Sequence, residues 1–235
     1  MKPSVSVVVP ARNEEEFIGA CLESILKQDP PPYEVIVVDN ASTDRTGEIA
    51  RSMGAKVIYQ GQIGLHIARQ TGLEAATGDI VAATDADCVV EPGWIAAIQD
   101  AFADPQVVEV YGPIEFMDGP LLDRWLSRYG FPIFLRIMHL LGQPNASGGN
   151  HAVRRQVALE VGGYDVPYAE DLRLMLKLKK RGKILYLPRA RVKTSSRRLK
   201  RGRWGFYGLH LKNVLARLLG RPADYGEDYY ADRNR

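Results

Sequence analysis

The sequence predicts an α/β protein with a Rossmann-like, mostly parallel central sheet flanked by helices. Short runs of β-branched and apolar residues alternate along the chain with segments whose apolar residues recur at helical spacing. One helical segment separates each strand-like run from the next, as in βαβ units. The 235 residues are 46% hydrophobic and 25% charged, which is ordinary for a globular protein with a sizeable core.

In the first half of the chain, local signals mark where these elements begin and end. We expect strands at 33–39, 55–60 and 79–88 after a first strand at 5–11, and helices at 13–28, 45–54 and 64–78. Pro10 ends the first strand, and Asn13 is expected to be the N-cap of the first helix. Thr43 or Asp44 caps the second helix, which Gly54 stops.

In the second half the pattern changes but stays α/β. We expect helices at 92–104 and 170–180, a single strand at 107–116, and one or two amphipathic helices within 119–142. Residues 145–165 read as loop, short strand, helix and glycine-rich turn, and a final strand follows Gly182. The sequence contains neither a G-x-G-x-x-G run after the first strand nor a Walker A motif.

Polar residues follow three of the predicted strands. They are Pro10-Ala11-Arg12, Asp39, and the pair Asp85 and Asp87. Ligands of open parallel sheets bind at the carboxyl ends of the strands. We therefore expect a site at this edge of the sheet.

Asp85 and Asp87 interrupt an otherwise apolar run, where a charge is costly unless it is paired. If the segment is extended, residues two apart face the same side, and both carboxylates address one ligand. Carboxylate oxygens suit Mg²⁺ or Mn²⁺, which would bridge a diphosphate. The alternative is a solvated turn with helix-capping aspartates.

Two further motifs also have a structural alternative. Glu170 and Asp171 open a helix, where carboxylates are favoured by the helix dipole, but one of them could also take a proton from an attacking hydroxyl. Gly148, Gly149 and Asn150 form either a hairpin turn or a loop that lets a ligand approach the backbone closely.

The positive charge is concentrated at the C-terminal end. Residues 189–235 contain 13 Lys/Arg and 4 Asp/Glu, while the remainder contains 18 and 24. Residues 189–204 hold eight basic residues and no acid, which suits a diphosphate as well as a solvated face. A basic segment also fits an anionic membrane or a nucleic acid.

Two segments, 121–141 and 203–219, are amphipathic and aromatic, and predict contact either with a membrane surface or with the protein's own core. No apolar run is long enough for a transmembrane helix, and we expect no signal peptide. Cys21 and Cys88 are far apart, which argues against a disulfide or a zinc site. We therefore expect a cytoplasmic protein, with possible attachment at the inner face of the cytoplasmic membrane.

Six segments in order resemble the inverting, family 2 glycosyltransferases, which have the GT-A fold. They are VSVVVPARNEE, YEVIVVDNASTDRT, GLHIARQTGLEAATGDIVAATDADC, GGNHAVRR, GGYDVPYAEDLRLMLKLKKRG and TSSRR, spread over residues 5–198. The resemblance implies transfer of a sugar from a nucleotide-diphosphate sugar, with Mg²⁺ or Mn²⁺, to a glycan or lipid-linked acceptor. UDP is the favoured nucleotide and GDP the alternative, and no nucleic acid partner is expected.

The resemblance also implies roles for individual residues. Asp171 would be the general base and Asp87 the metal ligand. The expected donor nucleotide contacts are Pro10, Ala11, Arg12, Glu14, Asp39, Arg69 and Asp85. Gly148, Gly149, Asn150 and Glu170 would form the sugar and acceptor loop, and Lys193, Arg197 and Arg198 would bind the diphosphate.

The chain departs from the family pattern in three places. Gln70 stands where the family often has Asn, and residues 192–194 offer no histidine as a further metal ligand, so a lysine is expected to neutralise the diphosphate instead. Residues 200–204 lack the glutamine of the processive polysaccharide synthases. We expect a GT-A domain over 1–200, with a nucleotide-sugar half (1–88) and an acceptor half (89–200), followed by a basic extension over 201–235.

Two other functions compete with this expectation. A nucleotidyltransferase would also use carboxylates and Mg²⁺, but it usually has a basic glycine-rich loop after the first strand, where this chain reads PARNEEEF. A non-enzymatic module for phosphates, nucleic acids or membranes would use the basic segment alone, and would leave Asp85, Asp87 and Asp171 without a task.

Overall fold

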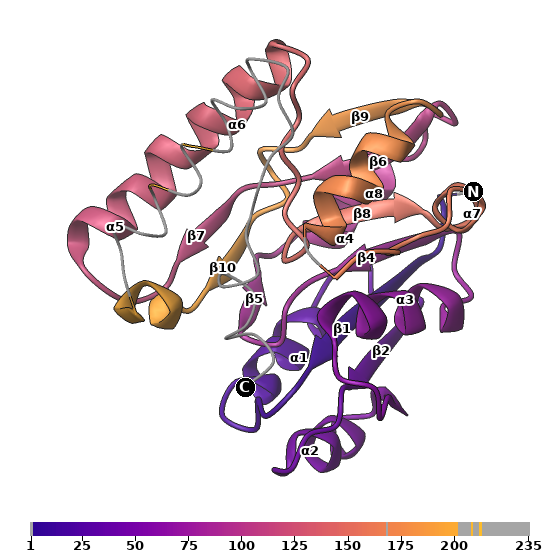
Figure 1. Ribbon diagram of the computed structural model, residues 1–235, viewed down its shortest axis with the longest axis vertical. Helices are drawn as coiled ribbons and strands as arrows, with labels where there is room; N and C mark the ends of the chain where they lie inside the picture. Colours follow the sequence, from indigo (N-terminus) through magenta and orange to yellow (C-terminus); the bar gives the residue numbers. More distant parts are fainter. Residues whose placement is uncertain (1, 168, 202–207, 209–211, 213–235) are drawn as a thin grey trace.

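A seven-stranded sheet forms the centre of the computed structural model, which describes residues 2–167, 169–201, 208 and 212 (Figure 1). The strand order is β3-β2-β1-β4-β8-β6-β9. Its strands are β1 (Val5–Ala11), β2 (Glu34–Asp39), β3 (Lys56–Tyr59), β4 (Ile80–Ala83), β6 (Val107–Tyr111), β8 (His151–Arg154) and β9 (Lys183–Tyr186). β8 is antiparallel to both of its neighbours, and the other pairings are parallel. The predicted α/β class and mostly parallel sheet are confirmed.

Helices cover both faces of this sheet. On one face lie α1 (Ile18–Leu26), α2 (Thr46–Ser52) and α4 (Trp94–Ala101), and on the other lie α3 (Leu65–Ala75), α7 (Arg155–Glu160) and α8 (Glu170–Leu178). The buried strands supply alternate side chains to the two cores: Val7 and Val9 face one of them and Val8 the other. At Gly72 of α3, a Cβ would come within 2.2 Å of Val8, so the glycine lets this helix lie close on β1.

A small second sheet brings together three short strands that are far apart in the sequence. It has the order β5-β10-β7, with β5 (Cys88–Val90), β10 (Val192–Thr194) and β7 (Ile114–Phe116). The expected single strand over 107–116 is therefore wrong: Gly112 and Pro113 divide it, and its two parts belong to different sheets. Pro113 has no N–H for a continuous ladder, and at Gly112 a Cβ would meet the carbonyl oxygen of Ala190.

A long helical rod runs along one edge of the molecule (Figure 1). It consists of α5 (Leu121–Trp125), a π-helical turn η1 (Leu126–Gly130) and α6 (Phe131–Leu140), which confirms the predicted helical segment. A 3-10 helix, η2 (Ser196–Arg201), follows β10. Most of 201–235, including the predicted amphipathic helix over 203–219, lies outside the described residues. Among the residues that are described, no helix is long and apolar enough to cross a membrane.

The predicted start of the first helix is wrong. α1 begins at Ile18, and Asn13 lies in the preceding loop with a positive φ of 52°. The Asn13 side chain accepts a hydrogen bond from the Thr43 backbone N–H (2.8 Å), and its own N–H donates to Ser42 (3.1 Å). Asn13 therefore joins the loops after β1 and β2 and does not cap a helix.

Candidate functional site

Asp85 and Asp87 lie in a turn between the two sheets, and not in an extended strand as expected. β4 ends at Ala83 and β5 begins at Cys88, whose N–H donates to the Asp85 carbonyl (3.0 Å). The turn occurs because the chain leaves the large sheet here and enters the small one. Both carboxylates nevertheless reach one cleft.

That cleft lies at the carboxyl ends of β1 and β4. It is lined by Pro10, Ala11, Arg12, Glu14, Asn40, Leu65, Ala68, Asp85, Ala86 and Asp87. Most of the residues expected to contact the donor nucleotide therefore surround one space. Because β1, β2 and β4 are parallel neighbours, their carboxyl ends bring together loops that are far apart in the sequence.

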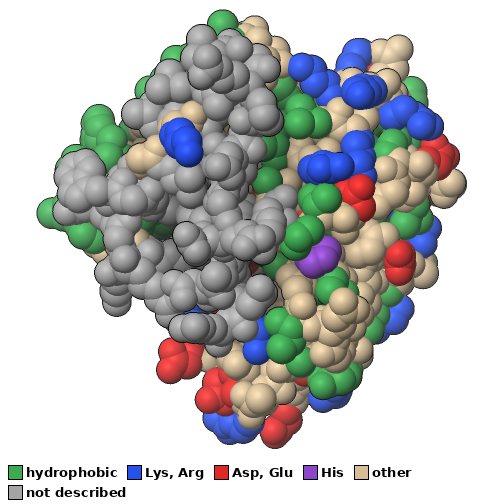
Figure 2. Space-filling model, in the orientation of Figure 1, with side chains coloured by type: hydrophobic (Ala, Val, Ile, Leu, Met, Phe, Trp, Pro, Cys, Tyr) green, Lys and Arg blue, Asp and Glu red, His purple; other side chains and the backbone are tan. Residues whose placement is uncertain are grey.

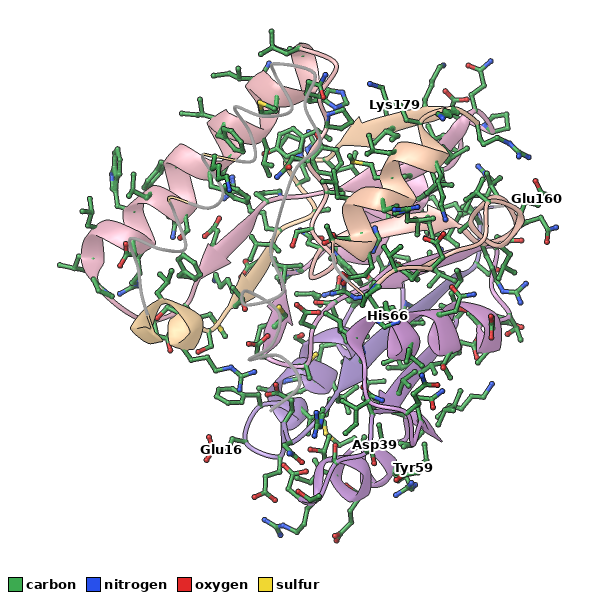
Figure 3. All side chains as sticks on the ribbon, viewed as in Figure 1. Glu16, Asp39, Tyr59, His66, Glu160 and Lys179 are labelled. Carbon is green, nitrogen blue, oxygen red and sulfur yellow. The ribbon has the colours of Figure 1, made fainter. Side chains whose placement is uncertain are left out.

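Asp39 lies beside this cleft at the end of β2, where it pairs in register with Tyr59 of β3 (Figure 3). Its carboxylate accepts a hydrogen bond from the Ser42 N–H (3.0 Å). A Cβ at Gly47 would come within 2.5 Å of the same carboxylate. Asp39 thus shapes the loop after β2, and its expected contact with the base stays a prediction.

Asn40, which sequence reasoning missed, organises the outer wall of the cleft. Its side-chain amide donates to the carbonyls of Gln60 (3.1 Å) and Gln62 (2.7 Å) and accepts from the Gly64 N–H (2.8 Å). These bonds tie the end of β2 to the loop that leads into α3. The available signal was its position next to Asp39, directly after a buried strand.

Arg69 is buried at the inner end of the cleft, with 2% of its surface exposed. Its guanidinium binds Asp85 Oδ1 (2.7 Å) on one side and the Glu170 carboxylate on the other. Burial lowers the pKa of Arg69, but the two carboxylates outweigh this effect and raise the pKa above its usual value. Arg69 is therefore an internal link between the D-x-D turn and the start of α8.

Asp171, the expected general base, lies in the first turn of α8. Its Oδ2 accepts a hydrogen bond from the Gly148 N–H (2.6 Å), and its Oδ1 accepts one from the Leu172 N–H (2.7 Å). Ala169 directly before the helix has a positive φ of 49°, which is uncommon for a residue with a side chain. Strain of this kind is typical of functional sites, where the surrounding structure maintains it.

Hydrogen bonds to the interior of the protein hold the glycine loop, residues 148–150, in place. The Gly149 carbonyl accepts a hydrogen bond from the Thr84 hydroxyl (3.1 Å). Asn150 is buried: its amide donates to the carbonyls of Pro113 (2.9 Å) and Ala190 (2.8 Å) and accepts from the Trp94 indole (2.9 Å). The Asn150 side chain therefore anchors the loop inside the protein, while Gly148 and Gly149 lie against Arg69 and Asp85.

The expected diphosphate residues occupy different places. Lys193 forms an ion pair with Glu91 (2.5 Å) on the small sheet. Arg197 reaches the cleft, where its guanidinium binds Asp87 Oδ2 (3.0 Å) and the Glu14 carboxylate. The side chain of Arg198 lies outside the described part of the protein. Of the expected diphosphate residues, Arg197, and not Lys193, thus lies against Asp87 of the D-x-D turn.

The oxygen donors at Asp87 fit a Mg²⁺ or Mn²⁺ ion. The hard carboxylate oxygens of Asp87 border the cleft, and a carboxylate is the ligand that these ions prefer. The described residues contain no group of three His, Cys, Asp or Glu side chains able to hold a metal. At nucleotide sites Mg²⁺ commonly combines one or two carboxylates with phosphate oxygens and water.

Comparison with known proteins agrees with the family resemblance seen in the sequence. The family model for glycosyl transferase family 2 matches residues 6–162. Glycosyltransferase AglE of Haloferax volcanii is 38% identical over 122 residues, which cover 48% of this chain and 40% of the relative. The match thus spans less than half of that relative's length.

Two solved structures are also similar. Mannosyltransferase PcManGT from Pyrobaculum calidifontis, in complex with GDP-Man and Mn²⁺, has a TM-score of 0.72 and 26% identity, covering 98% of this chain and 67% of its own. Glucosyl-3-phosphoglycerate synthase from Mycobacterium tuberculosis, in complex with Mn²⁺, UDP and phosphoglyceric acid, has a TM-score of 0.66 and 25% identity, covering 95% and 81%.

Proposed function

Because the chain belongs to glycosyl transferase family 2, we propose that it is an inverting transferase that moves a sugar from a nucleotide-diphosphate sugar to a hydroxyl or phosphate of an acceptor. One observation carries this proposal. The cleft that contains Asp85 and Asp87 connects through Arg69 and Glu170 to Asp171, which stands next to the glycine loop. Buried ion pairs thus connect the residues proposed for the donor site to the candidate base.

The mechanism follows from these positions. Asp171 takes the proton from the acceptor oxygen as that oxygen attacks the anomeric carbon. The bond from that carbon to the diphosphate breaks on the opposite side, so a single displacement inverts the configuration. Asp87 would hold a Mg²⁺ or Mn²⁺ ion, and the chemistry such an ion would supply is neutralisation of charge on the departing diphosphate. Arg197 adds a second positive charge near the same turn.

The donor is proposed to be a UDP-sugar or, as the alternative, a GDP-sugar. The similar structures support both, because one was solved with UDP and the other with GDP-Man, each with Mn²⁺. The acceptor is proposed to be a glycan or a lipid-linked molecule.

The helical rod of residues 121–141 supports a lipid-linked acceptor, since it is suited to peripheral contact with a membrane. Six of its exposed apolar residues recur every four positions: Leu121, Trp125, Tyr129, Ile133, Ile137 and Leu141. Leu122 and Leu140 are exposed as well. Four residues overshoot an α-helical turn of 3.6 residues, and the wider π turn of η1 reduces this drift in the middle of the rod. Figure 2 shows hydrophobic side chains at the edge of the molecule where Figure 1 places α5.

The charges along this rod favour an anionic surface. Arg124, Arg128 and Arg136 are exposed, whereas Asp123 is buried. Basic residues beside an apolar helical face are typical of helices that lie in a membrane interface. We therefore propose that the protein acts in the cytoplasm, at the inner face of the membrane.

A screen of nucleotide sugars with Mg²⁺ and Mn²⁺ tests the proposed activity. We expect a thermal shift and slow hydrolysis with one UDP- or GDP-sugar, and loss of the shift with the Asp87→Asn variant. Absence of any response would favour a non-enzymatic module, while release of inorganic pyrophosphate from a nucleoside triphosphate and a sugar phosphate would favour a nucleotidyltransferase.

A further inference from the structure

Arg197 occupies the position that a cation bound to Asp87 would need. Its Nη2 lies 3.0 Å and its Nε 3.2 Å from Asp87 Oδ2, and Nη2 also binds the Glu14 carboxylate. The guanidinium carbon lies 4.7 Å from the centroid of the Phe17 ring, within cation–π range. Side chains from two separate segments, the loop after β1 and the D-x-D turn, therefore surround this one arginine.

The start of η2 fixes the approach of Arg197 to the cleft. The Ser196 N–H donates to Asp118 Oδ1 (2.5 Å), and the Ser195 hydroxyl donates to Asp118 Oδ2 (3.3 Å). The Ser195 N–H also bonds to the carbonyl of Asp87 itself (3.3 Å). These contacts hold the backbone in place, so that rotation of the Arg197 side chain alone can carry its charge away from Asp87.

Asp87 needs a cation in every state of the protein. It is 4% exposed, and a carboxylate with so little access to water is stable only when it is paired. In this structure Arg197 supplies the positive charge. A divalent ion held by Asp87 would need the same carboxylate, so the guanidinium and the ion would compete for its negative charge.

We propose that Arg197 is a built-in counter-ion that exchanges between Asp87 and the diphosphate of the donor, and so couples metal binding to nucleotide binding. This inference rests on the proposed function. A metal ion alone must displace Arg197 from the carboxylates, which weakens its binding. A diphosphate offers the displaced guanidinium a bidentate partner, so that metal and nucleotide bind more tightly together than either does alone.

Direct measurement of Mn²⁺ binding tests the exchange without relying on turnover. Mn²⁺ is titrated into the full chain, with and without UDP or GDP, and the free Mn²⁺ is measured by electron paramagnetic resonance. Relative to wild type, we expect Arg197→Gln to bind Mn²⁺ alone about tenfold more tightly, and the enhancement by nucleotide to shrink by a similar factor. Arg191→Gln, which removes a comparable ion pair with Glu115 of β7, is the control and should leave both values unchanged.

Two results would overturn the exchange. One is unchanged or weaker binding of Mn²⁺ alone to Arg197→Gln, and the other is an undiminished enhancement by nucleotide in that variant. Asp87→Asn separates this failure from failure of the proposed function. If Asp87→Asn binds Mn²⁺ as wild type does, the metal site itself is wrong. If it loses Mn²⁺ while Arg197→Gln behaves as wild type, only the exchange is wrong.

Discussion

The backbone N–H of Gly148 donates a 2.6 Å hydrogen bond to Asp171 Oδ2, which joins the glycine loop to the first turn of α8. Behind this bond lies the buried Arg69, whose guanidinium would be only 1.8 Å from a Cβ at Gly148. The loop therefore lies flat on the arginine, and the arginine holds Glu170, the neighbour of Asp171. One compact unit thus sets the position of the candidate base.

Replacement of Asp171 by Asn should reduce turnover by about 10²- to 10⁴-fold, because an amide cannot accept the acceptor's proton. The amide oxygen can still accept the Gly148 N–H, and only the hydrogen bond from the Leu172 N–H is lost, so the protein should still fold and the Kd for the donor should be unchanged. Steady-state kinetics and a donor titration measure the two effects. Asp165→Asn, which affects only the ion pairs with Arg173 and Lys177, is the control; near-normal turnover of the Asp171 variant would refute the assignment.

Gly148→Ala should lower both stability and activity, since the added Cβ would overlap Arg69 and push the loop away from Asp171. Gly19→Ala on α1 is a matched control: nothing lies within 4 Å of its Cβ, and alanine favours a helix over glycine by about 1 kcal/mol. Gly148→Ala should therefore lower both the thermal unfolding midpoint and kcat, whereas Gly19→Ala should raise the midpoint and leave kcat unchanged. Equal behaviour of the two variants would show that the loop does not lie on Arg69.

Removal of the Arg69 charge should be among the most destabilising single changes. Arg69→Met leaves Asp85 and Glu170 without their shared cation, and breaking a buried ion pair typically costs about 3–5 kcal/mol. Urea unfolding measures this free energy. The double variant Arg69→Met/Glu170→Gln should recover part of the loss, because one of the two stranded carboxylates is then neutral; an additive loss would contradict the link.

The pH dependence of stability should contain a contribution from Glu109. Burial raises the pKa of Glu109, which is only partly offset by His151, whose Nδ1 lies 3.0 Å from the carboxylate and whose Nε2 lies 2.9 Å from the Tyr164 hydroxyl. The folded state therefore keeps the proton to a higher pH than the unfolded chain does. This contribution is fully present below the unfolded value of about 4.3 and is lost as the pH rises through the raised pKa.

Glu109→Gln should remove that loss, because the amide does not titrate. Unfolding midpoints of wild type and variant, compared from about pH 4 to pH 8, should converge at the acid end and separate as the pH rises. Parallel curves over the whole range would mean that Glu109 does not titrate differently in the folded state.

Removal of apolar side chains from the helical rod should weaken membrane binding. The triple variant Trp125→Ser/Ile133→Ser/Ile137→Ser keeps the arginines and removes exposed apolar surface, so flotation with phosphatidylglycerol vesicles should fall. Leu176→Ser, which changes an exposed leucine on α8, is the control and should float as wild type does. Flotation of the triple variant at the wild-type level would exclude this rod as the contact.

Local patterns in the sequence were enough for the class of fold and for most of the cleft. Strand runs such as 5–11 bury side chains on both faces, and this constraint is visible in the residues themselves. Parallel order then places the ends of β1 and β4 together, which is why Pro10 to Arg12 and Asp85 to Asp87 surround one space. Predictions from the sequence were wrong where a local pattern is compatible with two structures. Asn13 lies in a loop and not at a helix N-cap, and the segment 107–116 forms two strands and not one.

Taken alone, the sequence determined which carboxylates and which basic segment could form a site, because their chemistry and their places after strands depend on near neighbours. Only the tertiary structure decided which charges meet. Arg69 is 101 residues from Glu170, and Arg197 is 110 residues from Asp87, yet each pair is in contact. Such pairings depend on how the two sheets and the helices pack, so that burial, and not spacing along the chain, makes Arg69 an internal link and gives Asp87 its cation.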